Sequence, residues 1–129
     1  MELEKAKTKT ILAVDDEVEI LELLEARLSN QGYMVLTAEN GPAGLKIAKE
    51  ALPDLVLLDV SMKPIDGFEV LKRLKQDKRT VQIPVIMLTC RSEQADMERG
   101  IMNLAEKYIV KPFDEKALLE DIKQSLEYR

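Results

Sequence analysis

The sequence predicts an α/β protein with a doubly wound parallel sheet of five strands, and three observations support this prediction. Short runs of Val, Ile and Leu alternate with longer segments of helical periodicity along the chain. These runs are nearly continuous in apolar residues, which is typical of strands buried between two layers of helices. Charged residues follow three of the runs, at Asp15, Asp59 and Lys111. Together these features indicate five strand-then-helix units with polar groups at one edge of the sheet.

The first unit follows a charged, aperiodic segment over 1–9, which we interpret as a flexible leader. A strand ending at Asp15 precedes apolar residues that recur at helical spacing. This stripe consists of Val18, Leu21, Leu24 and Leu28. Asp16 and Glu19 offer a capping-box-like start to the helix, and Gly32 offers a stop.

The other units repeat the pattern. Strands are predicted over 33–38, 54–59, 83–88 and 107–110. Helices are predicted over 41–51, 67–76, 92–102 and 114–128. The helix over 92–102 has the weakest apolar stripe and contains Gly100, so we expect it to be loosely held.

Composition bounds the class of protein. The chain has 129 residues, 46% of them hydrophobic, which suits one domain over 10–129 with its own core. A net charge of -5 and a pI near 4.9 argue against direct binding to nucleic acid. No apolar run exceeds four residues and the start has no signal-peptide pattern, so we expect a soluble, cytoplasmic protein without a membrane span.

Two residue types limit the chemistry. The chain contains no histidine, so it has no histidine metal ligand, general base or phosphohistidine. Its single cysteine, Cys90, cannot form an internal disulfide, which fits a reducing compartment.

The charged residues at the strand ends predict a site. In open α/β sheets, ligands bind outside the carboxyl ends of the strands, where Asp15, Asp16, Asp59 and Lys111 are expected to meet. Three neighbouring carboxylates repel one another unless a cation neutralises them. We therefore expect a divalent cation, and ligation by oxygen alone with room for water favours Mg²⁺.

Each residue also has an ordinary structural explanation when taken alone. Asp15 and Asp16 could cap a helix, and Asp59 could end a strand in a turn. A threonine at position 89 is common in strands, and Lys111 could be a solvated surface lysine. It is their combination that favours a functional site.

The order Asp15-Asp16, Asp59, Thr89 and Lys111-Pro112 resembles the receiver domain of bacterial two-component response regulators, from position 10 onward. Asp66-Gly67 after the third strand adds to the resemblance. It implies a flavodoxin-like fold with strand order 2-1-3-4-5 and a cis Lys111-Pro112 bond.

The resemblance also implies a role for each site residue. Asp59 would be the nucleophile and phosphoacceptor. Asp16, Asp15 and the backbone carbonyl of Ser61 would bind Mg²⁺ together with Asp59. Lys111 and the hydroxyl of Thr89 would contact the phosphoryl oxygens.

Signalling follows from the same resemblance. A sensor histidine kinase or a histidine phosphotransfer protein would donate the phosphoryl group. Movement of Thr89 would couple to inward rotation of Tyr108, which alone could be ordinary core packing, and reshape the surface formed by 92–102, 107–110 and 114–128. A downstream effector would read this surface, and the chain would be a monomer or a weak homodimer through it.

Rival functions remain as alternatives. A pseudo-receiver would keep the fold and ignore phosphate, but the acidic set and Lys111 are intact. A turnover phosphatase would need a second carboxylate at the position of Ser61. A flavin carrier would need a phosphate-binding loop over 16–18, where the acidic Asp16 and Glu17 disfavour phosphate. The chain departs from the family at Lys63, where proline is common, and at Leu104 and Cys90. The sequence leaves open whether the domain is free-standing or part of a longer protein.

Overall fold

The computed structural model of the protein describes residues 7–90 and 104–127. Five parallel strands form one sheet in the order β2-β1-β3-β4-β5, as the family resemblance implied. The strands are β1 (Thr10–Val14), β2 (Met34–Ala38), β3 (Leu55–Asp59), β4 (Val85–Cys90) and β5 (Lys107–Lys111). The described helices are α1 (Val18–Asn30), α2 (Gly41–Ala51), α3 (Gly67–Gln76) and α4 (Glu115–Glu127).

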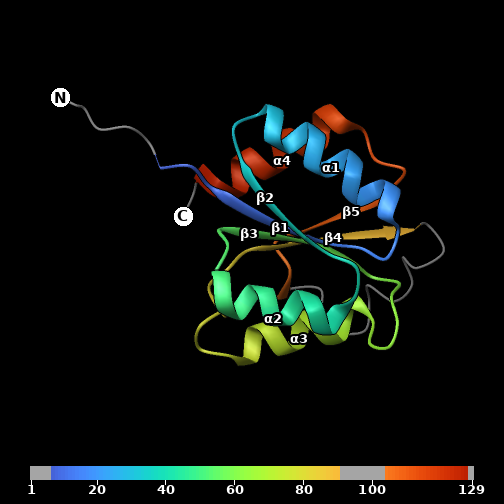
Figure 1. Cartoon of the computed structure of the whole chain (residues 1–129), viewed down its shortest axis with the longest axis vertical. Helices are drawn as coiled ribbons and strands as arrows, with labels where there is room; N and C mark the ends of the chain where they lie inside the picture. Colours follow the sequence, from blue (N-terminus) through green and yellow to red (C-terminus); the bar gives the residue numbers. More distant parts are fainter. Residues whose placement is uncertain (1–6, 91–103, 128–129) are drawn as a thin grey trace.

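The sheet lies between two layers of helices. Helices α1 and α4 cover one face, and α2 and α3 cover the other (Figure 1). Side chains alternate along β1, so that Ile11 and Ala13 pack beneath α1 and α4 while Leu12 and Val14 pack beneath α2 and α3. Because both faces are covered, every position of a central strand can be apolar, which explains the unbroken runs in the sequence.

Three strands begin later than predicted: β3 by one residue, and β2 and β4 because the residues before them belong to turns. The backbone N–H of Tyr33 donates to the Leu28 carbonyl oxygen at 3.2 Å, which ties it to the end of α1. The backbone N–H of Ile83 donates to the Thr80 carbonyl oxygen at 3.0 Å, so this residue closes a turn before β4. Apolar character alone does not distinguish a strand residue from a turn residue packed on the core.

The start of α1 differs from the prediction. Glu17, not Asp16, is the N-cap residue, and it makes no side-chain capping bond. The Asp15 carboxylate instead accepts a hydrogen bond from the backbone N–H of Glu17 at 2.9 Å. The predicted capping box is therefore wrong, because Asp15 and Asp16 lie at the edge of the sheet, before the N-cap residue of the helix. By contrast, the side chains of Asn40 and Asp66 accept backbone N–H hydrogen bonds and so cap the starts of α2 and α3.

The last helix lies within one residue of its predicted bounds. The helix predicted over 92–102 lies outside the described residues. None of the helices in the described part of the chain is long and apolar enough to cross a membrane.

Strand register brings the polar residues to the same level. Val14 pairs with Leu58, so Asp15 and Asp59 follow at neighbouring positions on adjacent strands. On the other side of β3, Cys90 pairs with Lys111, which brings the lysine to the end of β5 beside the end of β4. The fold thus gathers residues 15, 59 and 111 at the carboxyl edge.

Gly67 lets α3 begin directly against this edge. A Cβ at this position would overlap the carbonyl oxygen of Asp59 and lie 2.8 Å from the Cα of Val60. The backbone N–H of Gly67 also donates to the Val60 carbonyl oxygen at 2.7 Å. A residue without a side chain is therefore needed to hold the chain after β3 in place.

Candidate functional site

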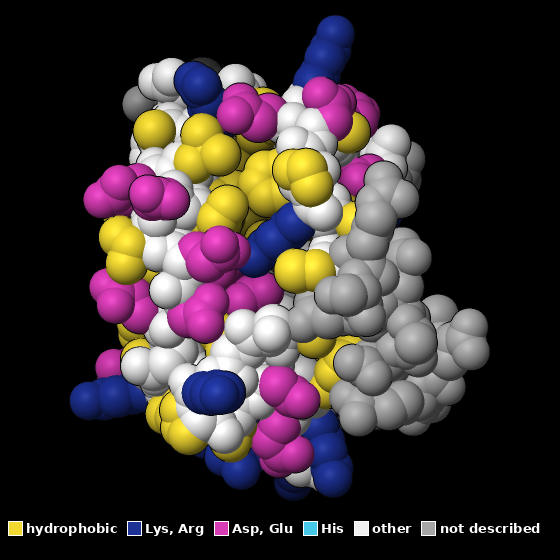
Figure 2. Space-filling view, turned by 90° about the vertical axis from the view of Figure 1, so that its right-hand side faces the viewer, with side chains coloured by type: hydrophobic (Ala, Val, Ile, Leu, Met, Phe, Trp, Pro, Cys, Tyr) yellow, Lys and Arg dark blue, Asp and Glu magenta, His cyan; other side chains and the backbone are white. Residues whose placement is uncertain are grey.

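Acidic side chains gather around a basic one on the face toward which the strands point (Figure 2). The group consists of Asp15, Asp16, Asp59 and Lys111, with Glu17 beside them. Asp15 and Asp16 follow β1, Asp59 ends β3, and Lys111 ends β5. The three strands thus contribute to one site, as the charged strand ends indicated.

The three aspartates form a compact cluster of possible metal ligands. One carboxylate oxygen from each of Asp15, Asp16 and Asp59 lies within 4.8 Å of the others. Asp15 and Asp59 are buried, whereas Asp16 is exposed. The cluster is therefore accessible to solvent at Asp16, where a hydrated cation can approach with part of its water shell.

Lys111 forms ion pairs with two members of this cluster. Its Nζ lies 2.9 Å from Asp15 Oδ2 and 3.1 Å from Asp59 Oδ1. The side chain of Lys111 is only 11% exposed, so water screens these contacts weakly. The Lys111-Pro112 bond is cis, as the resemblance implied, and the Lys63-Pro64 bond is cis as well.

Burial dominates the protonation of the two aspartates. It raises the pKa of the Asp59 carboxyl to about 7, and the neighbouring Asp15 charge acts in the same direction. Burial also raises the pKa of Asp15, although the hydrogen bond from Lys111 opposes this shift. One ammonium therefore does not fully compensate the acidic group, and a further cation would be accommodated.

The pKa of Lys111 is raised, whereas burial alone would lower it. Burial disfavours its ammonium form, but the hydrogen bond and charge of Asp15, followed by the charge of Asp59, outweigh that effect. The pKa of Lys111 therefore lies above its usual value, and the residue stays charged throughout the physiological range.

Of the three further predicted residues, Ser61 and Thr89 lie beside Asp59, whereas Tyr108 lies in the core, three residues before Lys111 on β5. The backbone of Ser61 lies close enough to the Asp59 carboxylate to lower its pKa, against the larger effect of burial. Thr89 is fully buried one position beyond the partner of Asp59 on β4, and its hydroxyl donates to the Cys90 carbonyl oxygen at 3.2 Å. Tyr108 on β5 is half-buried and packs against the core beneath α2 and α3, where burial raises the pKa of its phenol.

Glu17 is a site residue that the sequence reasoning did not identify. Its Oε1 lies 3.1 Å from Lys111 Nζ, although 61% of its side chain is exposed. In the sequence, Glu17 is simply the third of three consecutive acidic residues, and nothing in the pattern indicates where its side chain reaches. The run of three was the only available signal.

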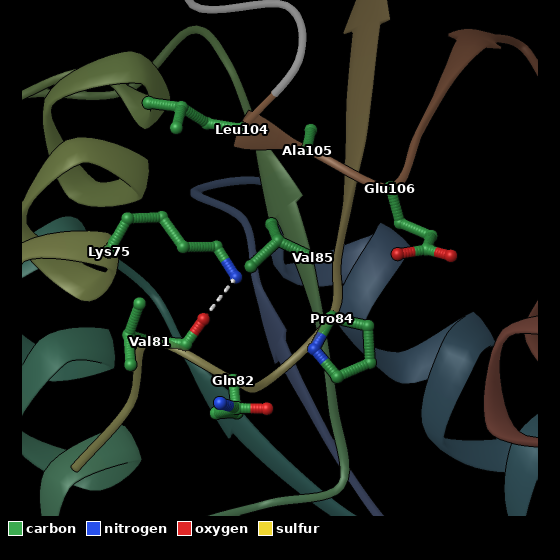
Figure 3. A pocket seen from close by; sticks show the side chains of 8 residues that line it. All are labelled: Lys75, Val81, Gln82, Pro84, Val85, Leu104, Ala105 and Glu106. Atoms are coloured by element: carbon green, nitrogen blue, oxygen red, sulfur yellow. Dashed lines mark hydrogen bonds between the residues drawn. The ribbon is translucent and has the colours of Figure 1, made fainter. Parts of the chain in front are cut away.

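A hollow of about 310 Å³ lies at the opposite edge of the sheet, where β4 and β5 begin (Figure 3). Lys75, Val81, Pro84 and Glu106 contribute to its lining. The Lys75 ammonium donates to the Val81 carbonyl oxygen at 3.1 Å and to the Ile83 carbonyl oxygen at 2.6 Å. This hollow contains none of the aspartates of the cluster and is separate from it.

Comparison with known sequences agrees with the geometry. The profile of the response regulator receiver domain matches residues 11–123. The phosphate regulon transcriptional regulatory protein PhoB of Pseudomonas aeruginosa is 41% identical over 118 residues, which cover 92% of this chain and 52% of PhoB. The transcriptional regulatory protein AfsQ1 of Streptomyces coelicolor is 41% identical over 109 residues, covering 84% and 47% respectively. The chain thus spans about half the length of these relatives.

Two solved structures share the same architecture over almost their whole length. A putative response regulator from Chloroflexus aurantiacus has a TM-score of 0.87 at 34% identity, covering 94% of this chain and 99% of that one. The response regulator TrrA of Thermotoga maritima, solved in complex with Mg²⁺ and BeF, has a TM-score of 0.83 at 38% identity, covering 92% and 100%. Together with the family match, these similarities show that the chain belongs to the response regulator receiver domain family.

Proposed function

We propose that the carboxyl-edge cluster is a phosphorylation site at which Asp59 accepts a phosphoryl group. A receiver domain acts in phosphorylation-dependent signalling and not as a turnover enzyme. The observation that carries the assignment of Asp59 is its position: it is 2% exposed and contacts Lys111 beside two further aspartates. It is the member of the cluster that ends the central strand.

The transfer requires a nucleophile and compensation of negative charge. An oxygen of the Asp59 carboxylate forms a bond to phosphorus while the bond between phosphorus and the donor's imidazole nitrogen breaks. The imidazole leaves with the bonding electron pair and takes a proton from water. Hydrolysis of the aspartyl phosphate by water later restores the carboxylate and releases inorganic phosphate. Positioning and electrostatics supply most of the catalysis in such a step.

The donor set fits Mg²⁺. Asp15, Asp16 and Asp59 offer carboxylate oxygens, and the backbone carbonyl of Ser61 is the fourth ligand that we propose. A bound Mg²⁺ supplies compensation for the negative charge of the phosphoryl oxygens. Lys111 donates to one phosphoryl oxygen, and the hydroxyl of Thr89 donates to another.

We propose that phosphorylation signals by changing one surface of the domain. Thr89 exchanges its bond to the Cys90 carbonyl oxygen for one to the phosphoryl group, and Tyr108 on the neighbouring strand rotates inward. The surface that changes includes β5 and α4, and the helix predicted over 92–102 as its third part lies outside the described residues. This is a two-state element biased by a local change of charge.

Partners follow from this chemistry. The donor is a phosphohistidine on a sensor histidine kinase or a histidine phosphotransfer protein, and the domain works in the cytoplasm. The effector that reads the changed surface lies in the same polypeptide or in a separate protein. PhoB and AfsQ1 are described as transcriptional regulatory proteins, which favours control of transcription as the output. The domain itself is a monomer or a weak homodimer through the changed surface.

Intact-mass spectrometry tests the proposal. The protein is incubated with acetyl phosphate, with and without Mg²⁺, alongside Asp59→Asn. The control is Asp121→Asn, which makes the same chemical change on α4, where the residue pairs with Lys107 away from the cluster. We expect one phosphoryl adduct on the wild type and on the control, only with Mg²⁺, and none on Asp59→Asn. An adduct on Asp59→Asn, or none on the wild type, would contradict the proposal.

A further inference from the structure

The ammonium of Lys111 has more partners than the family resemblance assigns to it. It lies 2.9 Å from Asp15, 3.1 Å from Asp59 and 3.1 Å from Glu17. A lysine ammonium has three N–H donors, and here three carboxylates accept them. Lys111 therefore has no donor left for a phosphoryl oxygen unless one of these contacts is released.

The three carboxylates are not equally easy to release. The side chains of Asp15 and Asp59 are 0% and 3% exposed, and Asp15 also accepts the backbone N–H of Glu17. The side chain of Glu17 is 61% exposed, so water can replace Lys111 as its partner. An exposed ion pair contributes little free energy, whereas a buried carboxylate that loses its partner is costly.

The position of Glu17 outside the acidic cluster also indicates that its contact with Lys111 is the easiest to release. The oxygens that lie together within 4.8 Å come from residues 15, 16 and 59. Glu17 is not among them, so a cation bound by these oxygens does not bind the Glu17 carboxylate directly. Glu17 would remain on Lys111 until another anion takes its place.

We propose that Glu17 is a positioning residue that holds Lys111 in the resting site and is displaced from it by the incoming phosphoryl group. This inference rests on the proposed function, because it takes the phosphoryl group as the ligand. Glu17 thereby competes with phosphate for Lys111, and its release accompanies phosphorylation. The length of its side chain matters as well as its charge, because the contact depends on reach.

Chemical labelling tests the resting contact without any phosphate. The rate at which an amine-acylating reagent modifies Lys111 is measured by peptide mass spectrometry in the absence of divalent cations. The variants are Glu17→Gln, which removes the charge, and Glu17→Asp, which keeps the charge and shortens the side chain. The matched control is Glu19→Gln, which removes one acidic charge from the first turn of α1. We expect labelling to rise about 2- to 5-fold in both Glu17 variants and to stay at the wild-type rate in the control. Equal labelling in all four proteins would overturn the resting contact.

Binding of beryllofluoride tests the competition. Its dissociation constant is measured at saturating Mg²⁺, and that of Mg²⁺ alone is measured separately. We expect both Glu17 variants to bind beryllofluoride about 2- to 5-fold more tightly, with Mg²⁺ affinity within about 2-fold of the wild type. Unchanged or weaker binding in Glu17→Gln, or an equal gain in Glu19→Gln, would overturn the displacement.

The two experiments separate this inference from the proposed function. A wild-type protein that binds no beryllofluoride would contradict the proposed function and, with it, the displacement. The labelling rates would still decide whether Glu17 holds Lys111. If the wild type binds beryllofluoride and the Glu17 variants match it, the proposed function stands and the displacement is wrong.

Discussion

Two lysines at opposite edges of the sheet are held in contrasting ways. At the amino edge, Lys75 donates to the backbone carbonyl oxygens of Val81 and Ile83, at 3.1 and 2.6 Å. At the carboxyl edge, Lys111 contacts the carboxylates of Asp15, Glu17 and Asp59. These hydrogen bonds of Lys75 connect the segment before β4 to α3, and both of these carbonyl oxygens are uncharged.

The difference shows that charge, rather than the size of a hollow, distinguishes a reactive site. The hollow beside Lys75 measures about 310 Å³, and two hydrogen bonds of Lys75 there go to backbone carbonyl oxygens. The carboxyl edge brings buried acidic groups together in excess over their cation, which raises the pKa of Asp59 to about 7. An arrangement that leaves charge uncompensated in the resting protein is one that can accept a cation and then an anion.

The largest effect is expected from exchanging each lysine for methionine. Lys111→Met should slow phosphorylation by acetyl phosphate about 100-fold at saturating Mg²⁺, because a charged donor to the phosphoryl oxygens is lost. Lys75→Met should react at the wild-type rate and lower the free energy of unfolding by about 1 kcal/mol through its lost hydrogen bonds. Time courses by intact mass and urea unfolding measure the two quantities. If both variants react equally fast, the contrast between the two edges is wrong.

A smaller effect is expected from the glycine that supports the carboxyl edge. Gly67→Ala should lower the free energy of unfolding by about 1–3 kcal/mol, because the added Cβ overlaps the Asp59 carbonyl oxygen. Phosphorylation should slow as well, since the backbone that carries Asp59 must move. Gly32→Ala is the comparison, because a Cβ there meets no atom within 4 Å and only its backbone, with φ of 95°, is strained. An unchanged phosphorylation rate in Gly67→Ala would show that the close approach does not position Asp59.

The smallest effect concerns pH in the absence of Mg²⁺. Folding raises the pKa of Asp59 from 3.8 to about 7, so the folded chain binds more protons than the unfolded chain between these values. The free energy of unfolding should therefore fall as the pH rises from about 4 to about 7. The raised pKa of Asp15 acts in the same sense. Asp59→Asn should reduce this fall by about 1–3 kcal/mol.

Urea unfolding at several pH values, with Asp121→Asn as the control, measures this dependence. Millimolar Mg²⁺ at pH 8 should restore part of the lost stability of the wild type, and less of it in Asp59→Asn. A wild-type stability that does not fall over this pH range would contradict the uncompensated charge at the carboxyl edge.

Most of the fold could be predicted from the sequence because strands that are buried on both faces have a simple apolar pattern. Runs such as 11–14 and 55–58 are apolar at every position, and that pattern has few explanations other than a covered parallel strand. Strand ends were less certain, since Tyr33 and Ile83 are apolar residues that belong to turns. The bounds of helices α2 and α3 match the predicted ranges, and capping by Asn40 and Asp66 supports both starts.

The site was predictable where topology alone determines position. Because the strands are parallel, the residues that follow them must share an edge, and this places Asp15, Asp59 and Lys111 together. Contacts that depend on the direction of a side chain could not be predicted. Asp16 was expected to cap α1, and the reach of Glu17 to Lys111 was not foreseen, because neither depends on hydrophobic pattern.

The central claim is that Asp59 is the phosphoacceptor, and locating the modification tests it most directly. The protein is treated with acetyl phosphate and Mg²⁺ and then with borohydride, which reduces an aspartyl phosphate to homoserine. Tandem mass spectrometry of the peptides then locates the converted residue. We predict homoserine at position 59 in the wild type. Homoserine at position 15 or 16 instead, or at no position despite a phosphoryl adduct on the intact protein, would contradict the assignment.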